Sequence, residues 1–156
     1  MKKIKIKETK QADSRTAQGN VTKETLLKES KLHIEAVSKV MAFMAQVIKA
    51  RGEKHDHTKI EYIDEFYDNF IATRNGGVEF KELGWWKKHL EERHHLEDKA
   101  PEDVNLIDVL EMVCDSVCAG LARSGEVREV KIHGFTLDQA VTNTVKLLES
   151  IIEVEK

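Results

Sequence analysis

The sequence contains little proline and little cysteine, and its net charge is small. Its 156 residues include a single proline, Pro101, and two cysteines, Cys114 and Cys118, and the formal net charge is −3. The scarcity of proline, together with long stretches without glycine, favours helices. A pair of cysteines four residues apart lacks the usual zinc-finger spacing, so we interpret the two as buried thiols. The small net charge gives no reason to expect general nucleic-acid binding.

A long apolar run is also absent from the sequence. No stretch approaches the roughly 18 consecutive apolar residues of a membrane span. The basic residues near the start are not followed by the apolar segment of a secretory signal. We therefore expect a cytoplasmic protein without membrane association. Apolar residues make up 40% of the chain and charged residues 34%, which is typical of one globular domain with exposed helix faces.

Apolar side chains recur at helical spacing from residue 22 onward and predict five main helices. Thr22 is the expected N-cap of the first helix, and Thr136 with Gln139 predicts a capping box at the start of the last. The five expected helices cover approximately residues 22–52, 58–73, 80–94, 103–123 and 136–152.

Strand-like alternation is confined to two short stretches, residues 2–7 and 126–133, which we expect to pair as a small ribbon. Residues 1–20 are otherwise polar and predict a flexible N-terminal segment. Residues 21–156 are expected to form a single helical domain. The predicted fold class is therefore all-α, a helical bundle with a possible two-stranded ribbon.

Histidine is concentrated in the first two thirds of the chain, with six of its seven occurrences between positions 33 and 95. His33 lies on an apolar stripe, where a lone histidine is more often a core residue than a ligand. Asp56, in the His55-Asp56-His57 segment, can equally serve as a helix cap. The histidines at 89, 94 and 95 fall near the end of a helix, where positive charge is favourable.

The fourth expected helix carries one acidic line, formed by Asp108, Glu111 and Asp115. An ordinary solvated face would look the same. Asp115, however, is surrounded by small and apolar residues, and a buried carboxylate needs a partner such as a metal ion. Each histidine or carboxylate group lies on or beside a different expected helix, which is how a metal centre in a helical protein is assembled. Nitrogen and oxygen donors together suit manganese, iron, cobalt, nickel or zinc.

The order His33, His55-Asp56, Asp115 resembles the HD superfamily of metal-dependent phosphohydrolases, which are all-helical proteins. A more particular resemblance is to small uncharacterised HD-like proteins of bacteriophages, and it covers roughly residues 22–127. The matching segments are His55-Asp56-His57-Thr58-Lys59, Trp85-Trp86 with His89, Arg93-His94-His95-Leu96, residues 101–111 and residues 122–127.

The resemblance implies an HD-type bundle with one or two divalent ions (Mn, Fe, Co, Ni, Zn or Mg). His33, His55, Asp56 and Asp115 correspond to the four HD ligands. His89 and His94 correspond to histidines that some HD proteins use for a second metal, with His95 as the alternative to His94.

The expected activity is hydrolysis of a nucleotide or another small phosphoester by metal-activated water. In this hypothesis Glu111 is the general base, and Lys59 and Arg93 contact the phosphate. Each of these two cations would look the same as a solvated surface residue. The alternatives are a non-catalytic phage interaction or structural protein that retains the metal site, and a plain helical bundle without metal. A phage protein would act in the host cytoplasm.

Overall fold

The structure, a computed structural model, describes residues 3–97 and 100–156. Its contacts divide the chain into two compact units. Unit 1 consists of Met1–Lys49 and Val145–Lys156, and unit 2 consists of Ala50–Thr144. The all-α fold with a small ribbon is confirmed: the described chain is mostly helical, with a sheet of two strands. None of the described helices is long and apolar enough to cross a membrane.

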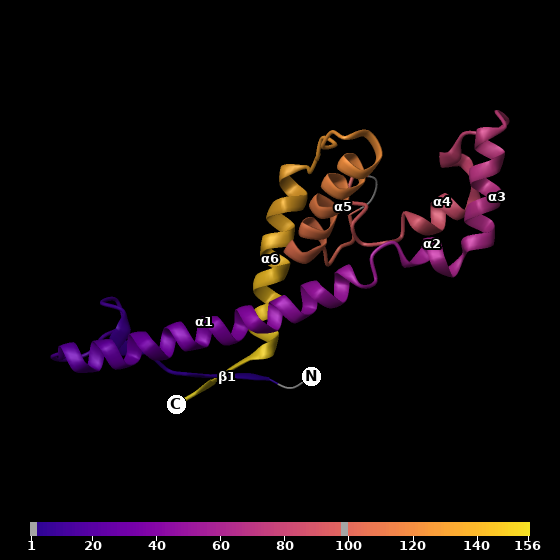
Figure 1. Ribbon diagram of the computed structural model, residues 1–156. Helices are drawn as coiled ribbons and strands as arrows, with labels where there is room; N and C mark the ends of the chain where they lie inside the picture. The colour runs from indigo at the N-terminus through magenta and orange to yellow at the C-terminus, as the bar shows by residue number, and fades with distance from the viewer. Residues whose placement is uncertain (1–2, 98–99) are drawn as a thin grey trace. The chain divides into compact units, whose positions relative to one another are not determined.

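The two strands of unit 1 come from opposite ends of the chain. β1 (Ile4–Lys7) pairs in parallel with β2 (Ile152–Glu155), as Figure 1 shows for β1 and the C-terminus. The register places Ile4 opposite Ile152 and Ile6 opposite Val154, so apolar residues face each other across the ribbon. Residues 126–133 are assigned no strand, so the prediction that they pair with the N-terminal strand was wrong.

The longest helix, α1 (Lys23–Gly52), supplies most of the rest of unit 1, after a short 3-10 turn at Lys10–Ala12. Thr22 Oγ1 accepts a hydrogen bond from the Thr25 amide at 3.1 Å, so the predicted N-cap is confirmed.

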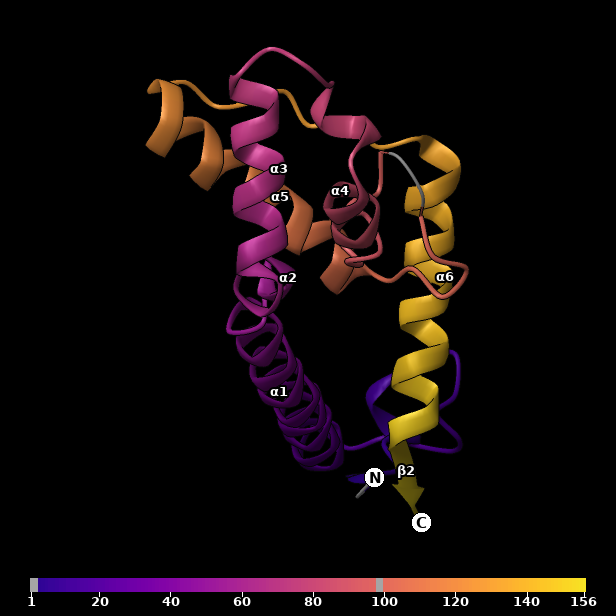
Figure 2. The ribbon, with the colours of Figure 1, turned by 90° about the vertical axis from the view of Figure 1, so that its right-hand side faces the viewer.

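Unit 2 contains α2 (His57–Glu61), α3 (Ile63–Arg74), a 3-10 turn (Phe80–Glu82) and α4 (Gly84–His89). It also contains α5 (Leu106–Ser124) and the first part of α6 (Gly134–Ile151). The helix expected over residues 58–73 is divided at Tyr62, whose ψ of 42° is not helical. α3 and α4 lie side by side (Figure 2). Because α4 ends at His89, His94 and His95 lie in the loop that follows it.

The core of unit 2 forms where α5 meets α6. Leu96, Val104, Met112 and Ala140 make one buried cluster there. α5 begins at a full capping box: Asn105 accepts from Ile107 N, and Asp108 accepts from Asn105 N at 2.9 Å. α5 turns Cys114 and Cys118 to its exposed side, so the prediction of two buried thiols was wrong.

The capping box expected for α6 does not form. Thr136 lies inside the helix, which already begins at Gly134. Gln139 donates instead from Nε2 to the Glu102 carbonyl oxygen at 2.7 Å. This bond attaches α6 to the segment that precedes α5, so the glutamine is used in tertiary contact rather than in capping.

Candidate metal centre

Two groups of side chains in unit 2 have the composition and spacing of metal ligands. Asp56, His89, His94 and His95 form the first, and His55, His94 and Asp115 form the second. Within each group the donor atoms all lie within 4.8 Å of one another. We call the two groups together the His/Asp centre. Four separate segments supply it: the turn before α2, the end of α4, the loop after α4, and α5.

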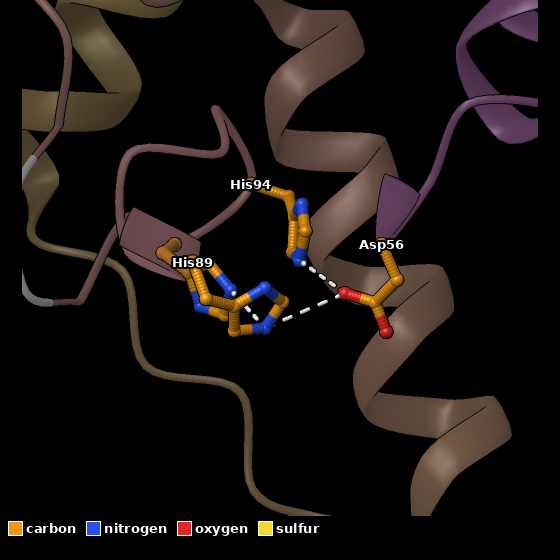
Figure 3. Close-up of side chains that lie close together, drawn as sticks. Asp56, His89 and His94 are labelled. Atoms are coloured by element: carbon orange, nitrogen blue, oxygen red, sulfur yellow. Dashed lines mark hydrogen bonds and ion pairs between the residues drawn. The ribbon is translucent and has the colours of Figure 1, made fainter. Parts of the chain in front are cut away.

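Asp56 occupies the turn between α1 and α2 with a left-handed backbone. Its φ of 54° is the one positive value among the described residues other than glycine. A non-glycine residue in this conformation costs about 1 kcal/mol or more, and such positions are concentrated at functional sites. The turn places Asp56 Oδ1 3.5 Å from His89 Nε2 and 3.6 Å from His94 Nε2, as Figure 3 shows.

His95 completes the first group. Its Nε2 lies 3.0 Å from His89 Nε2. This is a hydrogen-bond distance, and two imidazole nitrogens bound to one ion at about 2.0–2.1 Å would also lie about 3 Å apart, so the pair fits shared metal binding as well. Both His94 and His95, between which the sequence left the choice open, belong to this group, and which of them binds a metal stays a prediction.

The second group is built around His55. His55 Nε2 lies 3.4 Å from Asp115 Oδ1 and 3.5 Å from Asp56 Oδ2. The ring of His94 lies 4.4 Å from that of His55, centroid to centroid, which connects the second group to the first.

A hydrogen-bond chain fixes the orientation and the tautomer of His89. The Thr58 hydroxyl has one hydrogen, and its short contact with the ionised Glu92 carboxylate takes that hydrogen. Thr58 Oγ1 must therefore accept from His89 Nδ1, 2.8 Å away. The neutral His89 ring then carries its proton on Nδ1, which leaves the Nε2 lone pair directed into the centre.

Glu111 orients two other histidines in a similar way. Its Oε1 lies 3.1 Å from His55 Nδ1 and 3.4 Å from His94 Nδ1. Burial works to raise the pKa of Glu111, but the contacts with His55 and His94 outweigh it and lower the pKa to about 2. An ionised carboxylate behind a ligating histidine turns the other ring nitrogen toward the metal.

The charges of the histidines differ between the two groups. Burial lowers the pKa of His89, and burial with the neighbouring histidines lowers that of His95 to about 4. Contacts with Asp115 and Glu111 raise the pKa of His55 to about 10, and His55 in turn holds the pKa of Asp115 at about 2. His89 and His95 therefore offer neutral imidazoles at neutral pH.

Three buried polar atoms of the centre have no hydrogen-bond partner: Asp56 Oδ1 and both ring nitrogens of His94. Leaving such an atom unpaired costs about 1–3 kcal/mol, and more for a charged group. A cation held between these atoms would satisfy Asp56 Oδ1 and His94 Nε2 together. The residues therefore fit a divalent ion, and mixed imidazole and carboxylate donors favour a first-row transition metal.

One comparison with known proteins gives a match. A model of a protein family described as a family of unknown function, DUF5662, matches residues 22–154. The chain belongs to the DUF5662 family. No curated protein and no solved structure shows significant similarity to this DUF5662 chain.

The other predicted site residues of the DUF5662 chain have different surroundings. Lys59 contacts Asp56 closely, beside the first group. Arg93 donates from Nε and Nη2 to Asp108 and from Nη1 to Asp103. His33 lies on α1 in unit 1, whereas both groups lie in unit 2, and its assignment as a ligand stays a prediction.

Asp108 and Arg51 are residues around the centre that sequence reasoning missed. Asp108 is completely buried and binds Arg51 Nη1 at 2.7 Å as well as Arg93. Arg51 also reaches Glu111 at 3.2 Å. The pattern Asn105-x-x-Asp108 was a readable capping signal that would have separated Asp108 from a solvated acidic face. Nothing in the sequence marked Thr58 or Glu92 as partners of His89.

Proposed function

We propose that this protein is a metal-dependent phosphohydrolase acting on a nucleotide or another small phosphoester. The observation that carries the proposal is the convergence of Asp56 with the buried His89 and His94 from three segments, with no hydrogen bond to Asp56 Oδ1 or to either ring nitrogen of His94. In a helical bundle that binds no metal, buried polar atoms are normally hydrogen-bonded, so a cluster of such atoms without hydrogen bonds would be unexpected.

A bound divalent ion would lower the pKa of a water molecule toward neutrality and polarise a phosphoryl oxygen. Asp56, His89, His94 and His95 would hold one ion, and His55 with Asp115 offers a place for a second. The protein's own contribution is orientation. Thr58 and Glu111 direct the imidazoles, and Asp56 is positioned by its left-handed turn.

The roles proposed for the three catalytic candidates differ in their support. Lys59 lies beside Asp56 and on the wall of a cavity that reaches the centre, which supports a phosphate contact. Glu111 is 8% exposed in its side chain and contacts His55 and His94 of the centre, near enough to accept a proton through an imidazole or a water molecule. Arg93 is engaged with two carboxylates, so its contact with phosphate requires one of these pairs to open.

We further propose that the centre is of the HD type. The adjacency of His55 and Asp56 and the approach of Asp115 to His55 support this assignment. The same ligands would also serve a non-catalytic protein that keeps the ion only to hold its helices together. A structural metal site of that kind is closed to water, whereas a catalytic site keeps one position open for it.

A turnover screen tests the proposal. Nucleoside phosphates and simple phosphate esters would be incubated with the full chain and Mn²⁺, Co²⁺, Ni²⁺ or Mg²⁺, and release of phosphate would be measured. We expect turnover that EDTA abolishes and added metal restores. A chain that binds metal stoichiometrically and hydrolyses none of these esters would favour the structural alternative.

A further inference from the structure

A cavity of about 610 Å³ in unit 2 opens beside the first group of the His/Asp centre. His89, His95 and Asp115 form the part of its wall that belongs to the centre. The rest of its lining is of two kinds, aromatic side chains and cations, which together recognise a specific ligand chemistry.

The aromatic part of the wall is continuous with the centre. Phe66 and Phe80 lie 6.4 Å apart, and Phe80 lies 5.5 Å from Trp86, each measured between ring centroids. Trp86 in turn lies 6.0 Å from His95. A planar ring held on this wall therefore places a directly attached group next to the proposed metal ligands.

Not all of these aromatic rings are needed for the core. Trp85 is 1% exposed and stacks on His89 at 4.7 Å, so its role is to hold that ligand. Phe70, by contrast, is 45% exposed although it lines the cavity. An aromatic side chain with this exposure on a concave wall is available to a ligand ring.

The cations of the wall are Lys59, Arg74, Arg123 and Arg128. Arg74 lies over the Phe70 ring at 5.9 Å. No ion pair of Arg74, Arg123 or Arg128 is found among residues 3–97 and 100–156. Guanidinium groups without a carboxylate partner beside a metal site are suited to an anionic ligand.

A hydroxyl group on the same wall lacks a partner. Thr73 Oγ1 is buried and makes no hydrogen bond within the described chain. A ligand ring that carries its own nitrogen or oxygen atoms would satisfy this group, whereas a pure hydrocarbon ring would not.

We infer that this cavity binds a phosphoester in which the phosphate is joined, directly or through a sugar, to a heteroaromatic ring, with the ring against the Phe66–Phe70–Phe80 wall. The inference rests on the proposed function for the identity of the reacting group and adds the residues that select the rest of the substrate. Phe70 and Thr73 contact the ring, and the arginines contact the negatively charged phosphate.

Three probes separate these contributions. Adenosine monophosphate has both ring and phosphate, ribose 5-phosphate has the phosphate alone, and adenosine has the ring alone. Binding to the full chain would be measured by calorimetry, in Mn²⁺ and again in EDTA. We expect adenosine monophosphate to bind at least about tenfold more tightly than ribose 5-phosphate, because stacking on an aromatic side chain contributes about a factor of ten. It should also bind more tightly than adenosine, because its phosphate contacts the cations of the wall. Equal affinity for adenosine monophosphate and ribose 5-phosphate would overturn the inference.

Matched variants test the wall itself. Phe70→Ala should reduce the preference for adenosine monophosphate over ribose 5-phosphate about tenfold. Tyr67→Ala, on the same helix, exposed and outside the cavity, should leave that preference unchanged. Thr73→Val should weaken adenosine monophosphate binding without lowering the melting temperature, since it removes an unpaired hydroxyl. A preference that survives both cavity substitutions would also overturn the inference.

The outcomes for this cavity and for the proposed hydrolysis are distinct. Tight binding of adenosine monophosphate without hydrolysis of any ester would support the cavity and contradict the phosphohydrolase. Hydrolysis with no preference for ring-bearing substrates would support the phosphohydrolase and contradict the inference about the cavity.

Discussion

Three of the four histidines of the centre are each oriented by a neighbour that is not itself a proposed ligand. Thr58 accepts from His89, and Glu111 contacts the Nδ1 atoms of His55 and His94. Such partners decide which ring nitrogen faces the metal, and their loss weakens metal binding while the ligands remain in place. At the scale of single residues, Glu111 therefore tests whether the arrangement serves a metal.

We expect Glu111→Gln to weaken Mn²⁺ binding about 10–100-fold, because the amide keeps the shape of the side chain but loses the charge that orients two imidazoles. Competition against a chromophoric chelator would measure the dissociation constant. Glu102→Gln, at an exposed position of the same unit, is the control and should bind Mn²⁺ as the unsubstituted chain does. Equal affinities for both variants would contradict the role given to Glu111.

The pH dependence of folding provides a second test at this scale. In the metal-free chain the pKa of His95 is about 4, below its ordinary value of 6.5. Between these values the unfolded chain binds a proton that the folded chain does not, so stability should rise as the pH increases from about 4 to about 6.5. In EDTA, His95→Gln should show a shallower rise of melting temperature over this interval. A slope unchanged by the substitution would refute the buried, neutral state of His95.

The sequence predicted the individual residues of the centre better than their surroundings. His55, Asp56, His89, His94 and Asp115 were named as ligands because their order resembles that of the HD superfamily; these residues do lie together, and their binding of a metal stays a prediction. The burial of Asp108 was not recognised. An acidic line on a helix looks solvated unless the arginines that face it are known, and those come from distant segments of the chain.

At the scale of secondary-structure elements, α5 carries both Asp115 and Glu111, and its first turn fixes where they lie. Asp108 joins that turn to Arg51 at the end of α1 and to Arg93 in the loop before His94. One buried carboxylate therefore connects two of the segments that build the centre, α5 and the loop after α4, to the end of α1. The contacts of Arg93 with Asp108 raise the pKa of Arg93 above its ordinary value, so this guanidinium stays charged.

We expect Asp108→Asn to destabilise the chain by about 2–3 kcal/mol, because two guanidinium groups would each lose one charged partner in a partly buried setting. Asp103→Asn removes an exposed partner of the same Arg93 and should cost less than about 1 kcal/mol. Urea unfolding of the two variants gives the comparison. Similar losses from both substitutions would show that the buried carboxylate has no special role.

The errors at this scale have local causes. The stripe that predicted a helix through residue 152 could not reveal that Ile152–Glu155 would pair with Ile4–Lys7, since parallel pairing between the two ends of a chain leaves no local signal. The break at Tyr62 likewise follows no proline or glycine. The N-cap at Thr22 depends on local chemistry and was confirmed. The end expected near residue 123 is also close to the observed one, because Gly125, whose φ is 78°, ends α5.

At the scale of the whole molecule, the proposed chemistry is confined to unit 2. The ends of the chain, joined by the β1–β2 ribbon, belong to unit 1, and every residue of the two ligand groups lies within 50–144. A ligand that binds only the folded state stabilises it by about 2.7 kcal/mol at a hundred times its dissociation constant. The stabilisation by a bound metal ion should therefore be greatest in unit 2.

We expect saturating Mn²⁺ to slow amide hydrogen exchange chiefly in unit 2, most strongly in residues 55–59, 89–95 and 108–116. The β1–β2 ribbon of unit 1 should exchange at the same rate with and without the metal. Mass spectrometry of peptic fragments would resolve the two units. Protection gained mainly in the ribbon would place the metal elsewhere.

Metal content tests the central claim most directly. The full chain without an affinity tag would be loaded with Mn²⁺ or Co²⁺, dialysed, and analysed by plasma mass spectrometry beside three variants. Asp56→Asn keeps a residue type that tolerates the left-handed backbone, His94→Ala removes a ligand of both groups, and His133→Ala removes an exposed histidine as a control. The account predicts at least one ion per chain in the unsubstituted protein and the His133 variant, and a loss of bound metal in the other two. Undiminished metal in both Asp56→Asn and His94→Ala, or no bound metal in the unsubstituted chain, would contradict it.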